Sequence, residues 1–160
     1  NFVADVIAEN VKCDFAVTNS GGLRADISAG TVTYRDIYNA IPFDNTIVYT
    51  KLLGKEIKEM FEYSARSEYG ILQVSENVNL VYDRDRNLVS VRIKNVPIED
   101  NKFYVVATNN FVSSGGDGYV WFTRRQVVDT KKLLREAIKE YFQQKTPVIV
   151  KPKSRIIFEK

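Results

Sequence analysis

The hydrophobic residues of this chain change their spacing repeatedly along the sequence, and this alternation constrains the fold more than any other feature. Spacings of three and four residues are typical of helices with one buried face, whereas a spacing of two is typical of half-buried strands. The helical spacing covers residues 2–11, 57–64 and 130–144. Strand-like segments cover residues 14–18, 46–53, 77–83, 88–93, 102–109 and 155–158.

Two local motifs complete this outline. Thr33 and Asp36 form a capping box that predicts a short helix to about Ala40, and Pro42 follows as a stop. The turn-like segment 84–87 joins two strand-like segments and predicts a hairpin in the middle of the chain. Helices and strands in this order indicate an α/β or α+β domain, in which flanking helices cover a mixed β-sheet core.

The length and the charge narrow the classes of function. A chain of 160 residues predicts a single domain. Its 23 Lys and Arg are scattered among 20 Asp and Glu, for a net charge of +3, so we expect no nucleic-acid polymer as partner. Small anionic ligands suit a mildly basic chain. No segment approaches the roughly 20 apolar residues that a membrane span requires, so no span is predicted.

Histidine is absent from the sequence, and Cys13 is its one cysteine. These counts exclude catalytic triads that contain histidine, metal sites that contain histidine, and zinc sites made of several thiolates. A metal site built from carboxylates alone stays open. Cys13 lies beside an apolar run, and we interpret it as a small buried side chain.

Two loops beside predicted strands carry residues suited to binding, as loops on a rigid scaffold often do. In residues 18–24, two glycines precede Arg24, whose guanidinium suits a phosphate or a carboxylate. A tight turn followed by a solvated arginine is the alternative. In residues 41–46, Phe43 is either a core residue or an exposed aromatic platform.

A third loop, residues 109–119, holds three of the eight glycines of the chain, clustered around Asp117. Gly-Asp-Gly suits a hairpin turn, but the same glycines could instead present Asp117 to two hydroxyl groups, such as a ribose diol. The residues alone leave both interpretations open. Phe43 and Phe111 could stack on a planar base, and Arg24 could meet a phosphate, so the three loops together have the composition of a nucleotide site.

The chain resembles the C-terminal domain of the 5'-nucleotidase family over nearly its whole length. That family includes ecto-5'-nucleotidases, apyrases, UDP-sugar hydrolases and bacterial 2',3'-cyclic-nucleotide phosphodiesterases. The motifs that carry the resemblance occur in the family's order and are NSGGLR, GTVTYRDIYNAIPFDN, LLGKEIKEMFEYS, ILQVS and NNFVSSGGDGY. Glu76 departs from the pattern, because the family usually has glycine after Gln-x-Ser.

The resemblance implies a set of substrate-binding residues. Phe43 and Phe111 would stack on the two faces of the base, and Asp117 would bind the ribose hydroxyls. Arg24 would reach the phosphate side of the ligand. Further positions implied near the nucleoside are Asn19, Gly21 and Asn110. The ligand would be an AMP-like nucleotide, a nucleoside or a nucleotide sugar.

The resemblance also implies a partner domain. In the family, two divalent metal ions lie in an N-terminal metallophosphoesterase domain whose ligands are His, Asp and Asn. We therefore interpret residues 1–160 as one substrate-binding domain, a fragment of a longer two-domain phosphoric ester hydrolase, with no cofactor and no catalytic residue of its own. Alone it is expected to be inactive. Family members are typically exported or surface-bound, which implies an extracytoplasmic location: periplasmic, secreted or cell-surface.

Two alternatives remain at this point. The chain could be a stand-alone module that binds a nucleotide or nucleoside without catalysis. It could also be a structural domain that kept the fold and lost the site.

Overall fold

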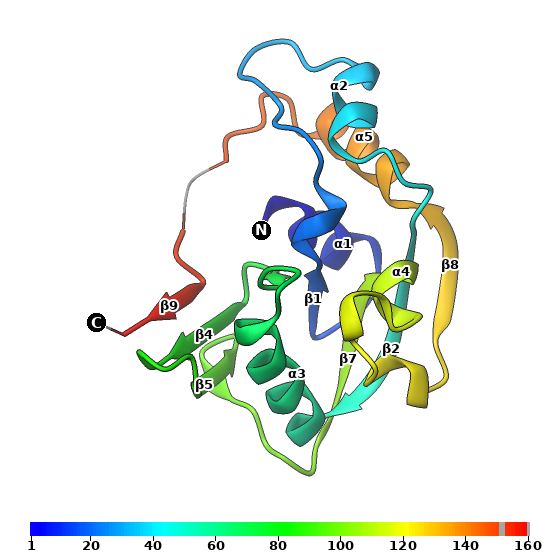
Figure 1. Ribbon diagram of the computed structural model, residues 1–160. Helices are drawn as coiled ribbons and strands as arrows, with labels where there is room; N and C mark the ends of the chain where they lie inside the picture. Colours follow the sequence, from blue (N-terminus) through cyan, green and yellow to red (C-terminus); the bar gives the residue numbers. More distant parts are fainter. Residues whose placement is uncertain (151–152, 160) are drawn as a thin grey trace.

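The computed structural model describes residues 1–150 and 153–159, and this part of the chain folds around two mixed β-sheets (Figure 1). The larger sheet has the order β3-β1-β7-β2-β8, formed by β1 (Phe15–Thr18), β2 (Thr46–Leu53), β3 (Gln73–Val74), β7 (Phe103–Asn109) and β8 (Val128–Leu133). The smaller sheet has the order β6-β5-β4-β9, formed by β4 (Val78–Tyr82), β5 (Leu88–Ile93), β6 (Val96–Pro97) and β9 (Ile156–Phe158).

Helices surround the larger sheet. The α-helices are α1 (Phe2–Asn10), α2 (Tyr34–Ala40), α3 (Gly54–Arg66), α4 (Asn110–Ser113) and α5 (Leu134–Gln144). Single 3-10 turns are η1 (Ser20–Gly22), η2 (Gly116–Gly118) and η3 (Phe122–Arg124). The mixed fold with flanking helices is thus confirmed, as is the central hairpin, because β4 and β5 pair in antiparallel register. The division into two sheets is a feature that the hydrophobic patterns did not indicate.

The capping box of α2 is present as predicted. The Thr33 hydroxyl accepts a hydrogen bond from the Asp36 backbone N–H, and the Asp36 carboxylate accepts one from the Thr33 N–H. The predicted helix over 130–144, however, begins too early. Residues up to Leu133 belong to β8, which pairs with β2. Lys131 has a φ of 62°, which a right-handed helix does not accommodate, so the helix starts only at Leu134.

Alternate residues of β1 point to opposite faces of the larger sheet, and each face has its own core. Phe15 and Val17 pack in a cluster with α3 and the hairpin strands β4 and β5. Ala16 packs in a second cluster with α1, α2 and α5. Because both faces of this sheet are covered by apolar side chains, its strands are held rigidly and only its edges and ends remain for binding.

The strand directions bring loops that are distant in sequence to one end of the larger sheet. β1 runs parallel to β7, with Phe15 opposite Val106. β2 runs antiparallel to β7, with Ile47 opposite Asn109. The carboxyl ends of β1 and β7 therefore lie at the same end as the beginning of β2. The loops that carry residues 19–24, 41–45 and 110–119 all emerge there.

Within the described part of the chain, no helix has both the length and the apolar character needed to span a bilayer.

Candidate functional site

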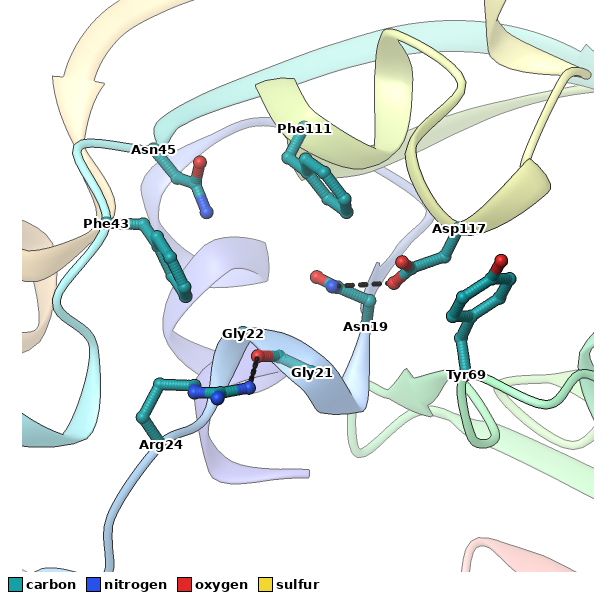
Figure 2. A pocket seen from close by; sticks show the side chains of 9 residues that line it. All are labelled: Asn19, Gly21, Gly22, Arg24, Phe43, Asn45, Tyr69, Phe111 and Asp117. Carbon is teal, nitrogen blue, oxygen red and sulfur yellow. Dashed lines mark hydrogen bonds between the residues drawn. The ribbon is translucent and has the colours of Figure 1, made fainter.

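A pocket of about 290 Å³ lies where these loops meet (Figure 2). Six of the seven residues predicted from the sequence line it, namely Asn19, Gly21, Arg24, Phe43, Phe111 and Asp117. Three further residues complete the wall, namely Gly22, Asn45 and Tyr69. The fold thus brings together four segments that lie up to about a hundred residues apart, as the contact between Asn19 and Asp117 shows at a separation of 98 residues.

Phe43 and Phe111 supply the apolar surface of the pocket. Their exposed fractions are 45% and 43%, unusually high for phenylalanine and too high for core residues. Phe43 lies in the loop between α2 and β2, and Phe111 lies on α4. Figure 2 shows the two rings pointing into the pocket from opposite sides. Of the two interpretations of Phe43, the exposed aromatic platform is therefore the correct one.

The position of Phe111 depends on a neighbouring glycine. A Cβ atom at Gly116 would lie 2.5 Å from Phe111 Cε1 and 2.6 Å from Phe111 Cζ, closer than non-bonded carbon atoms approach. Gly116 therefore allows the backbone of η2 to lie directly against the Phe111 ring. This contact holds the ring at the pocket wall while its other face stays exposed.

Asp117 is presented by a backbone that turns sharply around it. Gly115, Asp117 and Gly118 all have positive φ, at 91°, 52° and 82°. This conformation is costly for residues other than glycine, and glycine occupies two of these three positions, with Asp117 as the third. The segment follows α4, and β7 has already ended at Asn109, so it does not connect the two strands of a hairpin. The hairpin interpretation of Gly-Asp-Gly is therefore wrong, and this turn places the Asp117 side chain in the pocket wall.

Two contacts hold Asp117 in place. Its Oδ2 atom accepts a hydrogen bond of 2.9 Å from the Asn19 side-chain amide, and its backbone carbonyl accepts one of 2.9 Å from the Tyr63 hydroxyl. The Tyr63 ring also packs edge-on against Tyr119 at 5.4 Å. The Asp117 carboxylate is thus anchored on one oxygen, and it lines the pocket as a hydrogen-bond acceptor.

Arg24 lies at the rim of the pocket and is exposed. Its side chain makes one long contact, 3.5 Å from Nη1 to the Gly21 carbonyl. Its backbone N–H donates to the Ala40 carbonyl at 2.9 Å, which ties η1 to the end of α2. Within residues 1–150 and 153–159, the other guanidinium donors have no partner, which suits a group that binds an anionic ligand.

Asn110 does not line the pocket. Its side-chain oxygen accepts a hydrogen bond of 3.2 Å from the backbone N–H of Thr46, which joins α4 to the first residue of β2. Its neighbour Phe111 lines the pocket instead. In the structure, Asn110 connects two elements that carry pocket residues.

Three pocket residues, namely Gly22, Asn45 and Tyr69, were not among those predicted from the sequence. Asn45 stands two residues after Phe43 in the same motif, so its place in that motif was an available signal. Tyr69 is 52% exposed and lies in the loop after α3, where the Ser20 hydroxyl donates to the Ile71 carbonyl. No local pattern marks Tyr69, because its place in the wall depends on this contact between two distant loops.

The electrostatic surroundings leave Tyr69 as a neutral hydroxyl. A hydrogen bond with Glu68 and the negative charges of Glu68 and Asp117 raise the pKa of Tyr69 above its ordinary value. The pocket thus offers apolar rings, one carboxylate, two side-chain amides, a phenol and a guanidinium. Among residues 1–150 and 153–159, no cluster of three or more His, Cys, Asp and Glu side chains could hold a metal ion. This inventory suits recognition of a polar aromatic ligand that carries an anionic group.

Comparison with known proteins agrees with this geometry. Residues 1–124 match the family model described as "5'-nucleotidase, C-terminal domain". Protein UshA of Yersinia enterocolitica is 34% identical over 157 residues, which cover 94% of this chain and 28% of that protein. The NAD 5'-nucleotidase of Haemophilus influenzae is 34% identical over 144 residues, which cover 76% of this chain and 23% of that protein.

Solved structures give the same result. The crystal structure of a 5'-nucleotidase precursor from Thermus thermophilus superposes with a TM-score of 0.89 at 30% identity, covering 99% of this chain and 34% of that one. This chain therefore spans about a quarter to a third of the length of these relatives. The family match, the sequence identity and the shared fold together show that the chain belongs to the family of 5'-nucleotidase C-terminal domains.

Proposed function

We propose that this chain binds the nucleoside part of a nucleotide substrate for a metal-dependent phosphohydrolase. The observation that carries the proposal is the pair of exposed phenylalanine rings, Phe43 and Phe111, which point into one pocket that also contains the Asp117 carboxylate. A planar base fits between two aromatic faces, and a carboxylate suits the neighbouring sugar hydroxyls. The names of the relatives agree, since they include a 5'-nucleotidase and an NAD 5'-nucleotidase.

Each wall of the pocket has a role in this proposal. The base stacks between Phe43 and Phe111, at about 1–3 kcal/mol for each stacking contact. Asn45 points into the pocket beside Phe43 and offers a donor and an acceptor to the edge of the base (Figure 2). Asp117 accepts hydrogen bonds from the ribose hydroxyls. Arg24 at the rim meets the phosphate or phosphates, where its free donors are available.

The chemistry of hydrolysis belongs to another part of the enzyme in this proposal. Two divalent metal ions in an N-terminal domain would activate water and stabilise the charge that develops on the phosphoryl group. The contribution of this chain is to hold the nucleoside so that the phosphate is correctly placed, and to carry it to the metal centre by a hinge motion between domains. The resemblance to the family also implies that the parent protein would act outside the cytoplasm.

Calorimetric titration of the 160-residue chain with adenosine, AMP and UDP-glucose tests the proposal. We expect heat of binding for at least one of them at millimolar concentration. The variant Phe111→Ala should weaken that binding by about fivefold or more, because one stacking contact is lost.

Phe103→Ala is the matched control. Phe103 is also an exposed phenylalanine, at 52%, but it begins β7 and therefore lies at the opposite end of that strand from α4. Its removal should leave ligand affinity unchanged. If Phe111→Ala and Phe103→Ala behave alike, the base-stacking role is refuted. If none of the three ligands binds to the unmodified chain, the proposal fails as a whole.

A further inference from the structure

A row of buried side chains leads from α4 to the Asp117 carboxylate. Asn109, 1% exposed, is the N-cap residue of α4, and its Oδ1 atom accepts a hydrogen bond of 3.0 Å from the Val112 backbone N–H. Its Nδ2 atom donates to Asn19 Oδ1 at 3.1 Å. Asn19, 6% exposed, in turn donates from Nδ2 to Asp117 Oδ2 at 2.9 Å.

The direction of every hydrogen bond in this row is determined by its two ends. A backbone N–H can only donate, so Asn109 must turn its oxygen toward Val112 and its NH₂ group toward Asn19. The Asn19 amide must then present its oxygen to Asn109, which leaves its NH₂ group for Asp117. At the far end an ionised carboxylate can only accept. Donors and acceptors therefore match at each step, with a single orientation for both amides.

Thr18 accepts a second hydrogen bond from the Asn109 amide. Asn109 Nδ2 also donates to Thr18 Oγ1 at 3.2 Å, so both N–H groups of this amide have partners in the structure. Thr18, 3% exposed, is the last residue of β1, and Asn19 follows it directly. With both of its donors and its oxygen engaged, the Asn109 amide has no freedom to rotate without leaving a buried polar group unpaired.

We propose that Asn109 is a positioning residue that orients Asn19, and through it the Asp117 carboxylate, toward the ligand hydroxyls. Asn109 is not among the residues that line the pocket, and its effect acts through Asn19. The inference rests on the proposed function, because it assigns a cause to the orientation of the group that would bind the ribose. The Asn109 side chain then has two tasks. Its oxygen caps α4, and its NH₂ group orients the Asn19 amide.

The variant Asn109→Asp separates these two tasks. An aspartate remains a good N-cap and still accepts from the Val112 N–H, so α4 should keep its cap. The NH₂ group is replaced by an oxygen, which faces the oxygen of Asn19. The Asn19 amide then turns over to donate to the new carboxylate, and an oxygen instead of a donor faces Asp117. The Asp117 carboxylate thus loses its anchor, while the substituted residue itself lies outside the pocket lining.

The readout is the dependence of affinity on the ribose hydroxyls. We define the diol ratio as the dissociation constant of 2',3'-dideoxyadenosine divided by that of adenosine, both measured by calorimetry on the 160-residue chain. We expect a ratio of about 10 or more for the unmodified chain, since hydrogen bonds to a charged group are at stake. For Asn109→Asp we expect the ratio to fall at least about threefold toward one, with affinity for the dideoxy compound nearly unchanged.

Asn77→Asp is the matched control. The Asn77 side chain is also partly buried and engaged at both ends, since its NH₂ group donates to the Asp14 carbonyl and its oxygen accepts from the Ser75 hydroxyl. It does not line the pocket. The same substitution there should lower the melting temperature and leave the diol ratio at its original value.

The outcomes distinguish this inference from the proposed function. A high diol ratio in the unmodified chain that Asn109→Asp leaves unchanged refutes the positioning role alone. A ratio near one in the unmodified chain refutes the ribose contact and the positioning role with it. If circular dichroism shows Asn109→Asp to be unfolded, Asn109→Ser decides, because serine also caps a helix but has no amide to donate. A folded serine variant with the original ratio overturns the inference, and one with a lowered ratio supports it.

Discussion

Arg135, at the start of α5, holds the loop that carries Phe43. This residue is 6% exposed. Its Nη1 atom donates to the backbone carbonyls of Ile41 and Phe43 at 3.3 and 3.2 Å. Its Nη2 atom donates to Asp44 Oδ1 at 2.6 Å, and the group lies 4.7 Å from the centre of the Tyr38 ring. The loop is thus held at two of its backbone carbonyls and at the Asp44 side chain.

The variant Arg135→Met keeps the apolar stem and removes these donors, and the cost can be worked out contact by contact. Each long hydrogen bond to a carbonyl contributes about 1 kcal/mol, and the contact with the Tyr38 ring about 0.5–1 kcal/mol. The pair with Asp44 adds little, because that carboxylate is 81% exposed and well solvated. The Nε–H contact to the Tyr34 hydroxyl, at 3.3 Å, also adds little, because Tyr34 is 46% exposed. We expect a loss of about 3 kcal/mol in the free energy of unfolding, which corresponds to a fall of roughly 6–12 °C in melting temperature.

Thermal unfolding followed by circular dichroism measures the loss, and calorimetry with adenosine measures its effect on the site. Affinity should fall as well, because the loop no longer holds Phe43 against the base. Lys132→Met is the control. Lys132 pairs with Glu140 at 2.6 Å, but both side chains are about a third or more exposed, so about 0–1 kcal/mol is expected. A melting temperature for Arg135→Met within about 2 °C of the unmodified chain refutes the reasoning.

Three further predictions concern other parts of the molecule. Gly116→Ala should displace the Phe111 ring, because the added Cβ would lie 2.5 Å from that ring, and adenosine titration should show weaker binding with the fold retained; unchanged affinity would contradict the contact. Thr33→Ala should lower the melting temperature at pH 7, and by less as the pH falls. The hydrogen bond from Thr33 lowers the pKa of Asp36 below its ordinary 3.8. The stabilisation from this hydrogen bond is therefore present above pH 3.8 and is lost as the pH falls through the folded-state pKa of Asp36. A difference in melting temperature between the variant and the unmodified chain that stays constant down to about pH 2 would refute this. The 160-residue chain should release no phosphate from AMP even with added divalent metal, in a colorimetric phosphate assay, and robust metal-dependent turnover would disprove the assignment of catalysis to another domain.

The helices and strands with regular spacing could be predicted from the sequence because their signal is local. The helical spacing of Ile57, Met60 and Phe61 identified α3, and those residues are buried in the core. β8 could not be identified in this way, because its residues Asp129, Thr130 and Lys131 are polar and one of them has positive φ. Pairing with β2, a tertiary contact, makes this segment a strand.

The composition of the site could also be predicted, but its assembly could not. Phe43, Phe111 and Asp117 were recognisable as residues suited to a nucleotide. Nothing in their spacing shows that the loops meet, because this depends on the parallel pairing of β1 with β7. Tyr69 was not predicted for the same reason. The loop that carries it is held by a hydrogen bond from Ser20, which lies in the loop after β1. The residue types of the site could thus be predicted from local sequence, whereas their proximity depends on the topology of the sheet.

The parallel pairing of β1 with β7 limits how early the pocket can form during synthesis on the ribosome. Thr18, at the end of β1, contacts Asn109, at the end of β7, across 91 residues of sequence. Synthesis proceeds from the N-terminus, so β1 can pair with β3 early but must wait until residue 109 before β7, its other neighbour, is complete. A nascent chain that stops before residue 109 already contains Asn19, Arg24 and Phe43, yet it has no pocket for them to line. The pocket can therefore be completed only after residues 110–119 have been synthesised, and it does not grow as each motif is made.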